Sequence, residues 1–438
     1  MKNSYPVYKN IQIKNIKDWQ TGLSGELLIE DGVFVSELSA PAELVVDAQG
    51  LTALPGLIDA HVHLRDPGFE YREDIISGTK AAAHGGFTAV ATMPNTNPVA
   101  DTVPVICYQI EKAAAAAYCR VLPIGAATKG QAGKELAEIG LMAEAGAVAF
   151  SDDGVPIASA DMMRKAMEYA AFFDRVIISH SEDPDLSKDG VCNEGIVSTE
   201  MGLKGIPSIA EDIMIDRETR IAEYLGCFVH IAHVSTAGGV GAVRAAKARG
   251  VKVTAETCPH YFTLTEEAVR GFNTYAKVNP PLRTEADRLA VIEGLKDGTL
   301  DIIVTDHAPH HEDEKNCEFS LANNGMIGLE TCFPLVYTKL VEGGHLSLAD
   351  AVEKLTANPA KLLKQSTPSL EVGSRADLTL VDLDEAVAYD VSTSLSKARN
   401  TPFREMELKG FPQLTIMAGN ITWDSGRLVT IINNLQMI

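Results

Sequence analysis

The sequence predicts an α/β protein: a (β/α)8 TIM-like barrel with a small β-sandwich domain formed by the N- and C-terminal segments. In the middle of the chain, eight apolar runs rich in β-branched residues alternate with amphipathic helical stretches, which indicates βα units and a parallel sheet. Both chain ends instead show short runs of period two between Gly and Asp, which indicates strands and turns. The 438 residues are too many for one small core and fit one large barrel with an appendage.

The predicted elements run from a β-rich beginning to a β-rich end. Short strands are expected at 7–13, 25–35 and 42–50. The eight barrel strands are expected at 54–60, 87–93, 120–126, 147–151, 175–179, 228–232, 251–256 and 301–305. Helices are expected at 134–146, 159–173, 211–226 and 285–298, and C-terminal strands at 376–384, 403–410, 414–426 and 427–432. Residues 1–52 with 370–438 are therefore predicted to form the small domain, and residues 53–369 the barrel.

Composition and motifs disfavour several classes of protein. The competing fold is an open doubly wound sheet, but no G-x-G-x-x-G follows the first barrel strand, which disfavours a dinucleotide-binding domain. The net charge of −21 argues against nucleic acid and anionic membranes as partners, because both would repel the protein. No apolar run of about 18 residues suggests a membrane span, and the first residues lack the apolar core of a signal peptide. Seven cysteines at wide spacings, without C-x-x-C, indicate reduced thiols and a cytoplasmic protein.

Residues able to bind metal follow five of the eight predicted barrel strands. Active sites of such barrels lie at the carboxyl ends of the strands, so these side chains are expected to meet at one mouth. A single histidine or aspartate there is ordinarily a surface residue, a helix cap or a turn former, but two histidines two apart on a strand face the same side. Five strand ends with the same chemistry together predict a metal site. The candidates are His61, His63, Asp152 or Asp153, His180, His233 and Asp306.

Imidazole and carboxylate ligands suit zinc, and also manganese, cobalt or iron. A single catalytic zinc needs three protein ligands and a water, whereas this chain offers four histidines and two or three acids. The surplus predicts two ions that share a bridging carboxylate and ionise a water between them. The residue types alone do not decide between Asp152 and Asp153 as the bridge.

At this point the motifs resemble those of the dihydroorotases of the longer, bacterial type, within the amidohydrolase superfamily. D-A-H-V-H-L-R-D-P (59–67) is similar to that family's first signature, and T-D-H-A-P-H-H-E-D-E-K (305–315) to its second. M-P-N-T, S-D-D-G and K-V-N-P-P-L-R extend the resemblance through most of the chain. Hydantoinases and allantoinases share the first signature, but they generally bridge their metals with a carboxylated lysine after strand four. This chain has A-F-S-D-D-G there, as the longer dihydroorotases have an aspartate.

The resemblance implies a role for each metal ligand. His61, His63 and Asp306 would hold the first zinc ion, and His180 and His233 the second. Asp153 would contact both ions. Asp306 would also act as general acid and base toward a metal-bridging hydroxide, since a carboxylate can take its proton and deliver it to the leaving nitrogen.

The resemblance also implies a substrate side for the site. Arg65, Asn95 and His310 would hold the substrate carboxylate, Asn279 would contact the ring amide, and Gly325 would offer a backbone contact. His63 also belongs to the expected substrate contacts. The alternative for Arg65 is a surface salt bridge with Asp66 or Glu70, and for both asparagines it is turn formation beside proline. Residues 308–328 lack a clear period and are a candidate lid, whereas His230 is expected to pack behind the barrel wall.

The implied activity is the reversible hydrolysis of dihydroorotate to N-carbamoyl-L-aspartate in pyrimidine (UMP) biosynthesis. The implied partners are the small-molecule substrate, a second copy in a homodimer, and in some complexes aspartate transcarbamoylase. Two alternatives stay open. One is another cyclic amidohydrolase, such as a hydantoinase, dihydropyrimidinase or allantoinase. The other is a non-catalytic dihydroorotase-like partner of aspartate transcarbamoylase, although such chains lose metal ligands and this one has the full set.

Overall fold

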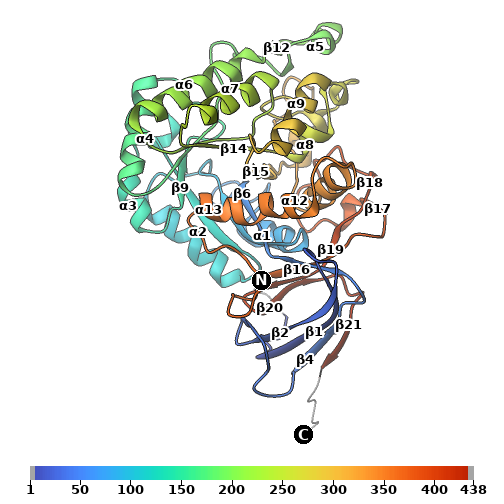
Figure 1. The fold of residues 1–438 in the computed structure, drawn as a ribbon. Coiled ribbons are helices and arrows are strands. Elements are labelled where there is room, and N and C mark those ends of the chain that lie inside the picture. Colours follow the sequence, from blue (N-terminus) through green and yellow to red (C-terminus); the bar gives the residue numbers. More distant parts are fainter. Residues whose placement is uncertain (1–4, 433–438) are drawn as a thin grey trace.

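Eight parallel strands form the central sheet of the computed structural model, which describes residues 5–432 (Figure 1). The hydrogen-bonded order is β15-β14-β13-β10-β9-β8-β7-β6, so each strand pairs with the next one along the sequence. The strands are β6 (Leu57–Val62), β7 (Phe87–Thr92), β8 (Arg120–Ala126), β9 (Ala149–Ser151), β10 (Ile177–Ser179), β13 (Val229–Ile231), β14 (Val253–Thr257) and β15 (Ile302–Ile303). All eight predicted barrel strands are confirmed.

The sheet closes by contacts between its first and last strands. Val62 forms a parallel bridge with His307, and the His63 amide donates to the His307 carbonyl at 2.8 Å. The Thr305 amide lies 3.3 Å from both carboxylate oxygens of Asp59. The carboxyl ends of all eight strands therefore surround one mouth, as a (β/α)8 barrel requires.

Burial explains why these runs form parallel strands. Every residue of β6 and β7 is buried, which is typical of strands covered by side chains inside the barrel and helices outside. One hydrophobic core joins strands and helices, with Val90, Ile124, Ile177 and Val291 among its members. The apolar runs in the sequence are thus the walls of the barrel.

Helices cover the outside of the sheet, mostly one per crossover. They are α1 (Ile75–His84), α2 (Val103–Ala116), α3 (Ile139–Glu144), α4 (Ala160–Phe172), α6 (Ile209–Leu225), α7 (Ala237–Ala248) and α9 (Glu285–Lys296). After β15, α12 (Leu348–Leu355) and α13 (Ala357–Leu362) pack beside β6. Local chemistry sets several ends: Ser159 caps α4, Thr284 and Asp287 form a capping box on α9, and Gly226 ends α6 with a φ of 64°.

The predicted helix at 134–146 is wrong in its first half. The Lys129 amide donates to the Glu135 carbonyl, and Thr128 forms an antiparallel bridge with Leu136. These bonds use the backbone of 135–137, so the helix begins only at Ile139. Helical composition was outweighed here by pairing with a neighbouring loop.

A nine-stranded sheet built from both chain ends lies beside the barrel, in the blue and red parts of Figure 1. Strand β1 pairs with β2, β4 and β5, which splits the sheet into two layers around a second core that includes Ile11, Ile29, Leu378 and Leu414. The small β-sandwich is confirmed. Its strands are β1 (Asn10–Asp18), β2 (Ser24–Glu30), β3 (Val33–Val35), β4 (Leu44–Asp47), β5 (Thr52–Pro55), β16 (Leu378–Asp382), β19 (Phe411–Met417), β20 (Asn420–Asp424) and β21 (Val429–Ile432).

The remaining elements lie mainly in loops. The strand expected at 403–410 joins no large sheet, because only Glu407–Leu408 (β18) pairs, with Val387–Ala388 (β17). The others are β11 (Cys192–Asn193), α5 (Ile196–Met201), β12 (Gly205–Ile206), α8 (Pro259–Thr263), α10 (Glu312–Lys315) and α11 (Cys332–Leu335). Within residues 5–432, no helix has the length and apolarity needed to span a bilayer.

Candidate active site

Four histidines and two aspartates converge at the carboxyl ends of the barrel strands. Asp153 Oδ1 lies 3.3 Å from His61 Nε2 and 3.4 Å from His233 Nε2, and its Oδ2 lies 3.5 Å from His63 Nε2. Asp306 Oδ1 lies 3.0 Å from His63 Nε2 and 3.6 Å from His61 Nε2. The structure therefore brings together side chains that lie up to 245 positions apart in the sequence, from His61 to Asp306.

His180 completes the cluster from the end of β10. Its Nδ1 lies 2.9 Å from His233 Nε2 and 3.8 Å from Asp153 Oδ1. All six predicted metal ligands thus surround one small volume, with both oxygens of Asp153 toward the histidines.

The structure separates the roles of the two adjacent aspartates. Asp152 accepts hydrogen bonds from the Ala127 and Thr128 amides and from the Thr128 hydroxyl, so it fastens the loop after β8. Asp153, the next residue along, turns into the mouth. Of the two alternatives from the sequence, only Asp153 has the position of a bridging carboxylate.

A carboxylate or amide oxygen lies beside one ring nitrogen of each of three histidines. His61 Nδ1 lies 2.6 Å from Glu256 Oε1, His63 Nδ1 lies 2.9 Å from Asn95 Oδ1, and His180 Nε2 lies 3.5 Å from Glu182 Oε2. When Nδ1 of His61 and of His63 donates to its acceptor, the lone pair of the other ring nitrogen faces the cluster. This is how proteins orient metal-binding imidazoles.

The surroundings of the two aspartates favour their ionised form. Burial opposes ionisation of Asp306, but the His63 hydrogen bond and the nearby His61 and His233 rings hold its pKa well below the usual range. The same histidines lower the pKa of Asp153 against the effect of burial. Both carboxylates are therefore ionised at neutral pH, which is the form that binds metal.

The cluster fits divalent metal ions. Among the described residues, His61 Nε2 and Asp153 Oδ1 are buried with no hydrogen-bond partner. Ligand atoms of His61, His63 and Asp306 lie within 4.8 Å of one another, as do those of His61, Asp153 and His233. Unpartnered buried donors and acceptors are rare in folded proteins, and two overlapping groups of three imidazole and carboxylate ligands suit a pair of ions.

Three residues of the mouth have left-handed backbone conformations. The φ angles are 61° at Arg65, 32° at His233 and 47° at Asp306. Such angles are uncommon for residues other than glycine and cost about 1–3 kcal/mol, and they concentrate at functional sites. Each lies where a strand turns into a loop, so the turn aims the side chain into the mouth.

A cavity of about 210 Å³ opens beside the cluster. Its lining includes every residue that the resemblance assigned to the substrate. These are His63, Arg65, Asn95, Asn279, His310 and Gly325. The volume suits a small molecule, and the lining combines the carboxylates of Asp153 and Asp306 with the cation of Arg65.

Arg65 is a cavity residue and not a surface salt bridge. It is 8% exposed, its Nε donates to the Pro309 carbonyl at 3.3 Å, and its Nη2 lies 3.4 Å from His310 Nε2. Asp66, its expected alternative partner, instead pairs with Lys112 at 2.6 Å. Burial and the Arg65 charge lower the pKa of His310 to about 3, so Arg65 faces a neutral imidazole and keeps its charge for a ligand.

Sequence reasoning missed the contacts behind the metal ligands. Glu256 is fully buried on β14, and its Oε2 lies 2.9 Å from His230 Nε2 while Oε1 holds His61. The prediction that His230 packs behind the barrel wall is therefore wrong: it faces Thr254 and Glu256 on the neighbouring strand. The alternation of Thr254 and Glu256 on a predicted strand was a signal, because both point to the same face. Glu182 was missed as well.

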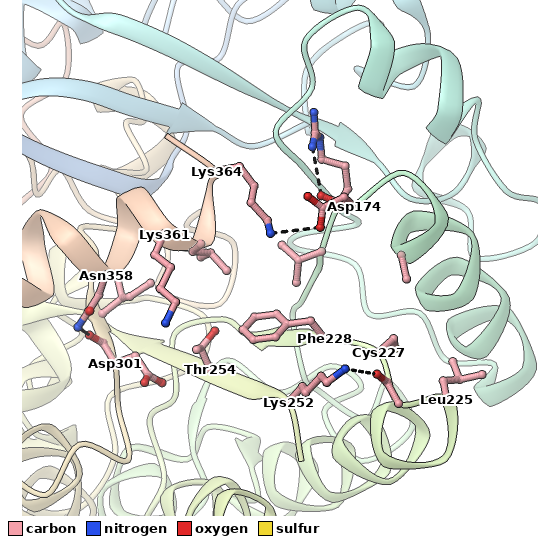
Figure 2. A pocket seen from close by; sticks show the side chains of 16 residues that line it. Asp174, Leu225, Cys227, Phe228, Lys252, Thr254, Asp301, Asn358, Lys361 and Lys364 are labelled. Carbon is pink, nitrogen blue, oxygen red and sulfur yellow. Dashed lines mark hydrogen bonds and ion pairs between the residues drawn. The ribbon is translucent and has the colours of Figure 1, made fainter. Parts of the chain in front are cut away.

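A larger cavity of about 530 Å³ lies at the opposite end of the barrel (Figure 2). It is basic, and three of the four cations in its lining contact other groups of the chain. Lys252 donates to the carbonyl of Gly226, where α6 ends, Lys364 pairs with Asp174 at 3.1 Å, and Arg175 donates to the Ala147 carbonyl. Cations at helix C-termini stabilise the unpaired carbonyls there. No histidine lines this cavity, so the smaller one is the candidate active site.

Comparison with known proteins decides the family. A family model described as dihydro-orotase-like matches residues 50–238. A dihydroorotase of Acetivibrio thermocellus is 54% identical over 413 residues, which cover 93% of this chain and 97% of the relative. A dihydroorotase of Pelotomaculum thermopropionicum is 56% identical over 377 residues, or 86% and 88% of the two chains. The chain belongs to the dihydroorotase family. The family predicted from the motifs at 59–67 and 305–315 is confirmed.

Solved structures of related cyclic amidohydrolases share the fold. An L-hydantoinase from Arthrobacter aurescens matches with a TM-score of 0.84 and 27% identity, over 96% of this chain and 97% of that one. A dihydropyrimidinase from Brevibacillus agri matches with a TM-score of 0.83 and 23% identity, over 97% of both chains. The barrel with a β-sandwich from the chain ends is thus the fold of this group of enzymes.

Proposed function

We propose that the protein is a dihydroorotase that hydrolyses the ring amide of dihydroorotate reversibly to N-carbamoyl-L-aspartate, a step of pyrimidine biosynthesis. The observation that carries the proposal is the cavity of about 210 Å³, whose lining includes members of the histidine–aspartate cluster as well as Arg65. The cluster matches an amide to be hydrolysed, and Arg65 matches a carboxylate to be held. Identity of 54% to a dihydroorotase over almost the whole chain supports the same substrate.

Two zinc ions are the proposed cofactor. His61, His63 and Asp306 would hold one ion, His180 and His233 the other, and Asp153 both. When bound, the ions would polarise the ring carbonyl and lower the pKa of a water between them. The donor set of imidazoles and carboxylates without thiolates supports zinc.

Asp306 is the proposed general acid and base. Its contacts with His63 and His61 use Oδ1, so Oδ2 can face the attacking water. Asp306 would take a proton from that water as the C–O bond forms, and deliver it to the ring nitrogen as the C–N bond breaks. In ring closure the same proton moves in the opposite direction.

Arg65, Asn95 and His310 are proposed to bind the substrate carboxylate, Asn279 to contact the ring amide, and Gly325 to offer a backbone contact. Arg65 can offer a two-pronged set of donors to a carboxylate, and its burial makes that contact stronger than in water. Asn279 is already held, since its Nδ2 donates to Glu182 at 2.8 Å, and its Oδ1 is a buried acceptor without a partner. A ring N–H would satisfy it.

Residues 53–369 are proposed to carry the catalysis and residues 1–52 with 370–438 to form the small domain, of which 1–4 and 433–438 lie outside the described residues. The seven cysteines are all free thiols, which supports a reducing, cytoplasmic compartment. A homodimer and a complex with aspartate transcarbamoylase stay predictions from the family resemblance.

The proposal is tested by metal analysis of the purified protein together with an assay of dihydroorotate ring opening. We expect about two zinc ions per chain, loss of activity with a chelator, and its return with zinc. Protein that carries its metal but leaves dihydroorotate unchanged would refute the proposed activity.

A hydantoinase or dihydropyrimidinase activity is the second candidate, because the fold matches an L-hydantoinase over 96% of the chain. Asp153 in place of a lysine argues against it. A panel of dihydroorotate, hydantoin and dihydrouracil at equal metal content distinguishes the two. The carboxylate-binding Arg65 predicts a strong preference for dihydroorotate, the only anionic substrate of the three.

A further inference from the structure

Two buried lysines contact the segment 316–325, whose last three residues line the candidate active site. Lys277 is 4% exposed and Lys315 is 1% exposed. Within the described residues, neither ammonium group has a carboxylate within ion-pair distance. Burial lowers the pKa of both side chains, and that of Lys315 to about 7, because it disfavours the charged form. Burying these polar groups is costly unless hydrogen bonds offset the loss of water.

Each ammonium group is satisfied by three backbone carbonyls. Lys277 Nζ donates to Phe319 at 2.7 Å, to Ser320 at 3.1 Å and to Ala322 at 2.7 Å. Since an ammonium has three donors and no acceptor, this arrangement uses its full capacity. The Lys277 ammonium group thereby fixes the backbone of residues 319–322, which have little regular structure.

Lys315 makes the same kind of contact nearer the cavity. Its Nζ donates to the carbonyls of Asn323 at 2.7 Å, Gly325 at 3.0 Å and Lys277 at 3.3 Å. It thus holds the residues on both sides of Asn324. The Gly325 amide donates back to the Lys277 carbonyl at 2.9 Å, which joins the two lysines into one unit.

The held segment carries part of the substrate wall. Asn323, Asn324 and Gly325 all line the cavity of about 210 Å³. The Asn324 carbonyl lies 2.8 Å from His310 Nε2, and His310 Nε2 lies 3.4 Å from Arg65 Nη2. A chain of contacts thus runs from Lys315 through Asn324 and His310 to the arginine that would bind the carboxylate.

Glycine is required at the end of this segment. Gly325 has a φ of 128°, and a Cβ there would lie 2.6 Å from the Ala308 Cβ. The backbone at Gly325 therefore packs directly against Ala308, and the position of this wall depends on the groups that hold the carbonyls of 316–325. A shift of about 1 Å in such a wall changes rates by about 100-fold.

We propose that Lys277 and Lys315 are positioning residues, which hold 316–325 in the shape that presents Asn324 and Gly325 to the substrate and orients His310. The expected change in KM rests on the proposed function. The expected change in hydrogen exchange of 316–325 can be measured without any substrate. Lys315 has the larger role, because it holds the carbonyls on both sides of Asn324. Lys277 supports the more distant carbonyls of 319–322.

The test compares Lys315→Met and Lys277→Met with a matched control, Lys361→Met, which removes an exposed lysine at the opposite end of the barrel. Methionine keeps the length of the side chain and removes the donors. For Lys315→Met we expect KM for dihydroorotate to rise at least 10-fold with a smaller change in kcat and an unchanged metal content. Lys277→Met should raise KM less, and the control should match the wild type. An unchanged KM in Lys315→Met would overturn the proposal.

Hydrogen exchange on the wild-type protein keeps the test decisive if a variant fails to fold. The Gly325 amide should be protected about as well as barrel strands such as β6, although it lies in a loop. In folded Lys315→Met, exchange across 316–325 should become at least 10-fold faster while β6 is unchanged. Rapid wild-type exchange at Gly325 would overturn the proposal even if the protein turns over dihydroorotate. Protection without turnover would instead refute only the proposed function.

Discussion

Replacing Glu256 with glutamine tests whether a buried carboxylate behind His61 sets metal affinity. Both oxygens of Glu256 are engaged, with His61 Nδ1 at 2.6 Å and His230 Nε2 at 2.9 Å, and the side chain is fully buried. The nearby imidazoles lower its pKa to about 2 against the effect of burial, so it is ionised at neutral pH. Glutamine keeps the shape and one acceptor but removes the charge.

The size of the effect follows from how outer carboxylates act on metal-bound imidazoles. The carboxylate raises the basicity of the ring and fixes its tautomer, and removing such a partner typically costs about 10- to 100-fold in metal affinity. This corresponds to about 1.4–2.7 kcal/mol of binding free energy. Because Glu256 contacts His61 alone among the six ligands, the loss should concern the first ion and spare the second.

The assay is competition for zinc with a chromophoric chelator, with circular dichroism as a check on folding. The matched control is Glu330→Gln. Glu330 is also buried and lies 2.9 Å from His84 Nδ1 and 3.1 Å from the Tyr389 hydroxyl, and neither of these residues is a proposed metal ligand. The control should lose stability but keep its metal affinity. Wild-type affinity in Glu256→Gln, or an equal loss in both variants, would refute the reasoning.

Three further changes test other parts of the site and the fold. Asp306→Asn should lower kcat by a factor on the order of 10³ while dihydroorotate still binds, because the proton carrier is lost and the carboxylate contacts remain; turnover near the wild-type rate would exclude Asp306 as the acid and base. Arg65→Lys should raise KM about 10-fold or more, because an ammonium cannot offer two parallel donors; an unchanged KM would contradict a carboxylate contact there. Burial raises the pKa of Glu218 from 4.5 to about 7. Between these pH values the folded state keeps a proton that the unfolded chain releases. The contribution of this group to the free energy of unfolding therefore falls as the pH rises from 4.5 to about 7. Glu218→Gln should therefore gain roughly 2–3 kcal/mol relative to the wild type between pH 5 and pH 8 in urea unfolding, and an equal difference at both pH values would contradict it.

The sequence was sufficient for the barrel because its strands are buried on both faces. Every residue of 87–92 is buried, and the run consists of small, aromatic and β-branched residues, so its composition predicts a strand without knowledge of what packs against it. The prediction of a helix at 134–146 was wrong in its first half. The composition there is helical, but the backbone at Leu136 pairs with Thr128 instead of forming helical hydrogen bonds. Local preference does not report contacts of that kind.

The candidate metal ligands could be predicted from the sequence, whereas the residues that hold those ligands in place could not. His61 and His63 share a strand face by their spacing alone, and the other ligands follow from a rule about strand ends. The choice of Asp153 over Asp152 needed coordinates, since either can turn inward where a strand ends. Around the barrel only β15 separates Glu256 on β14 from His61 on β6, whereas 195 positions separate the two residues in sequence, so only the folded structure reveals their contact.

The charges around the cluster explain why the substrate carboxylate needs its own binding group. The carboxylates that contact the four imidazoles are those of Asp153, Asp306, Glu256 and Glu182, which carry four negative charges when ionised. Two divalent ions would carry four positive charges and leave the cluster neutral overall. An anionic substrate would therefore gain little net attraction from the cluster, beyond the direct contact of its carbonyl. The proposed source of that attraction is the buried guanidinium of Arg65, which lines the same cavity, so affinity should depend on Arg65 and rate on Asp306.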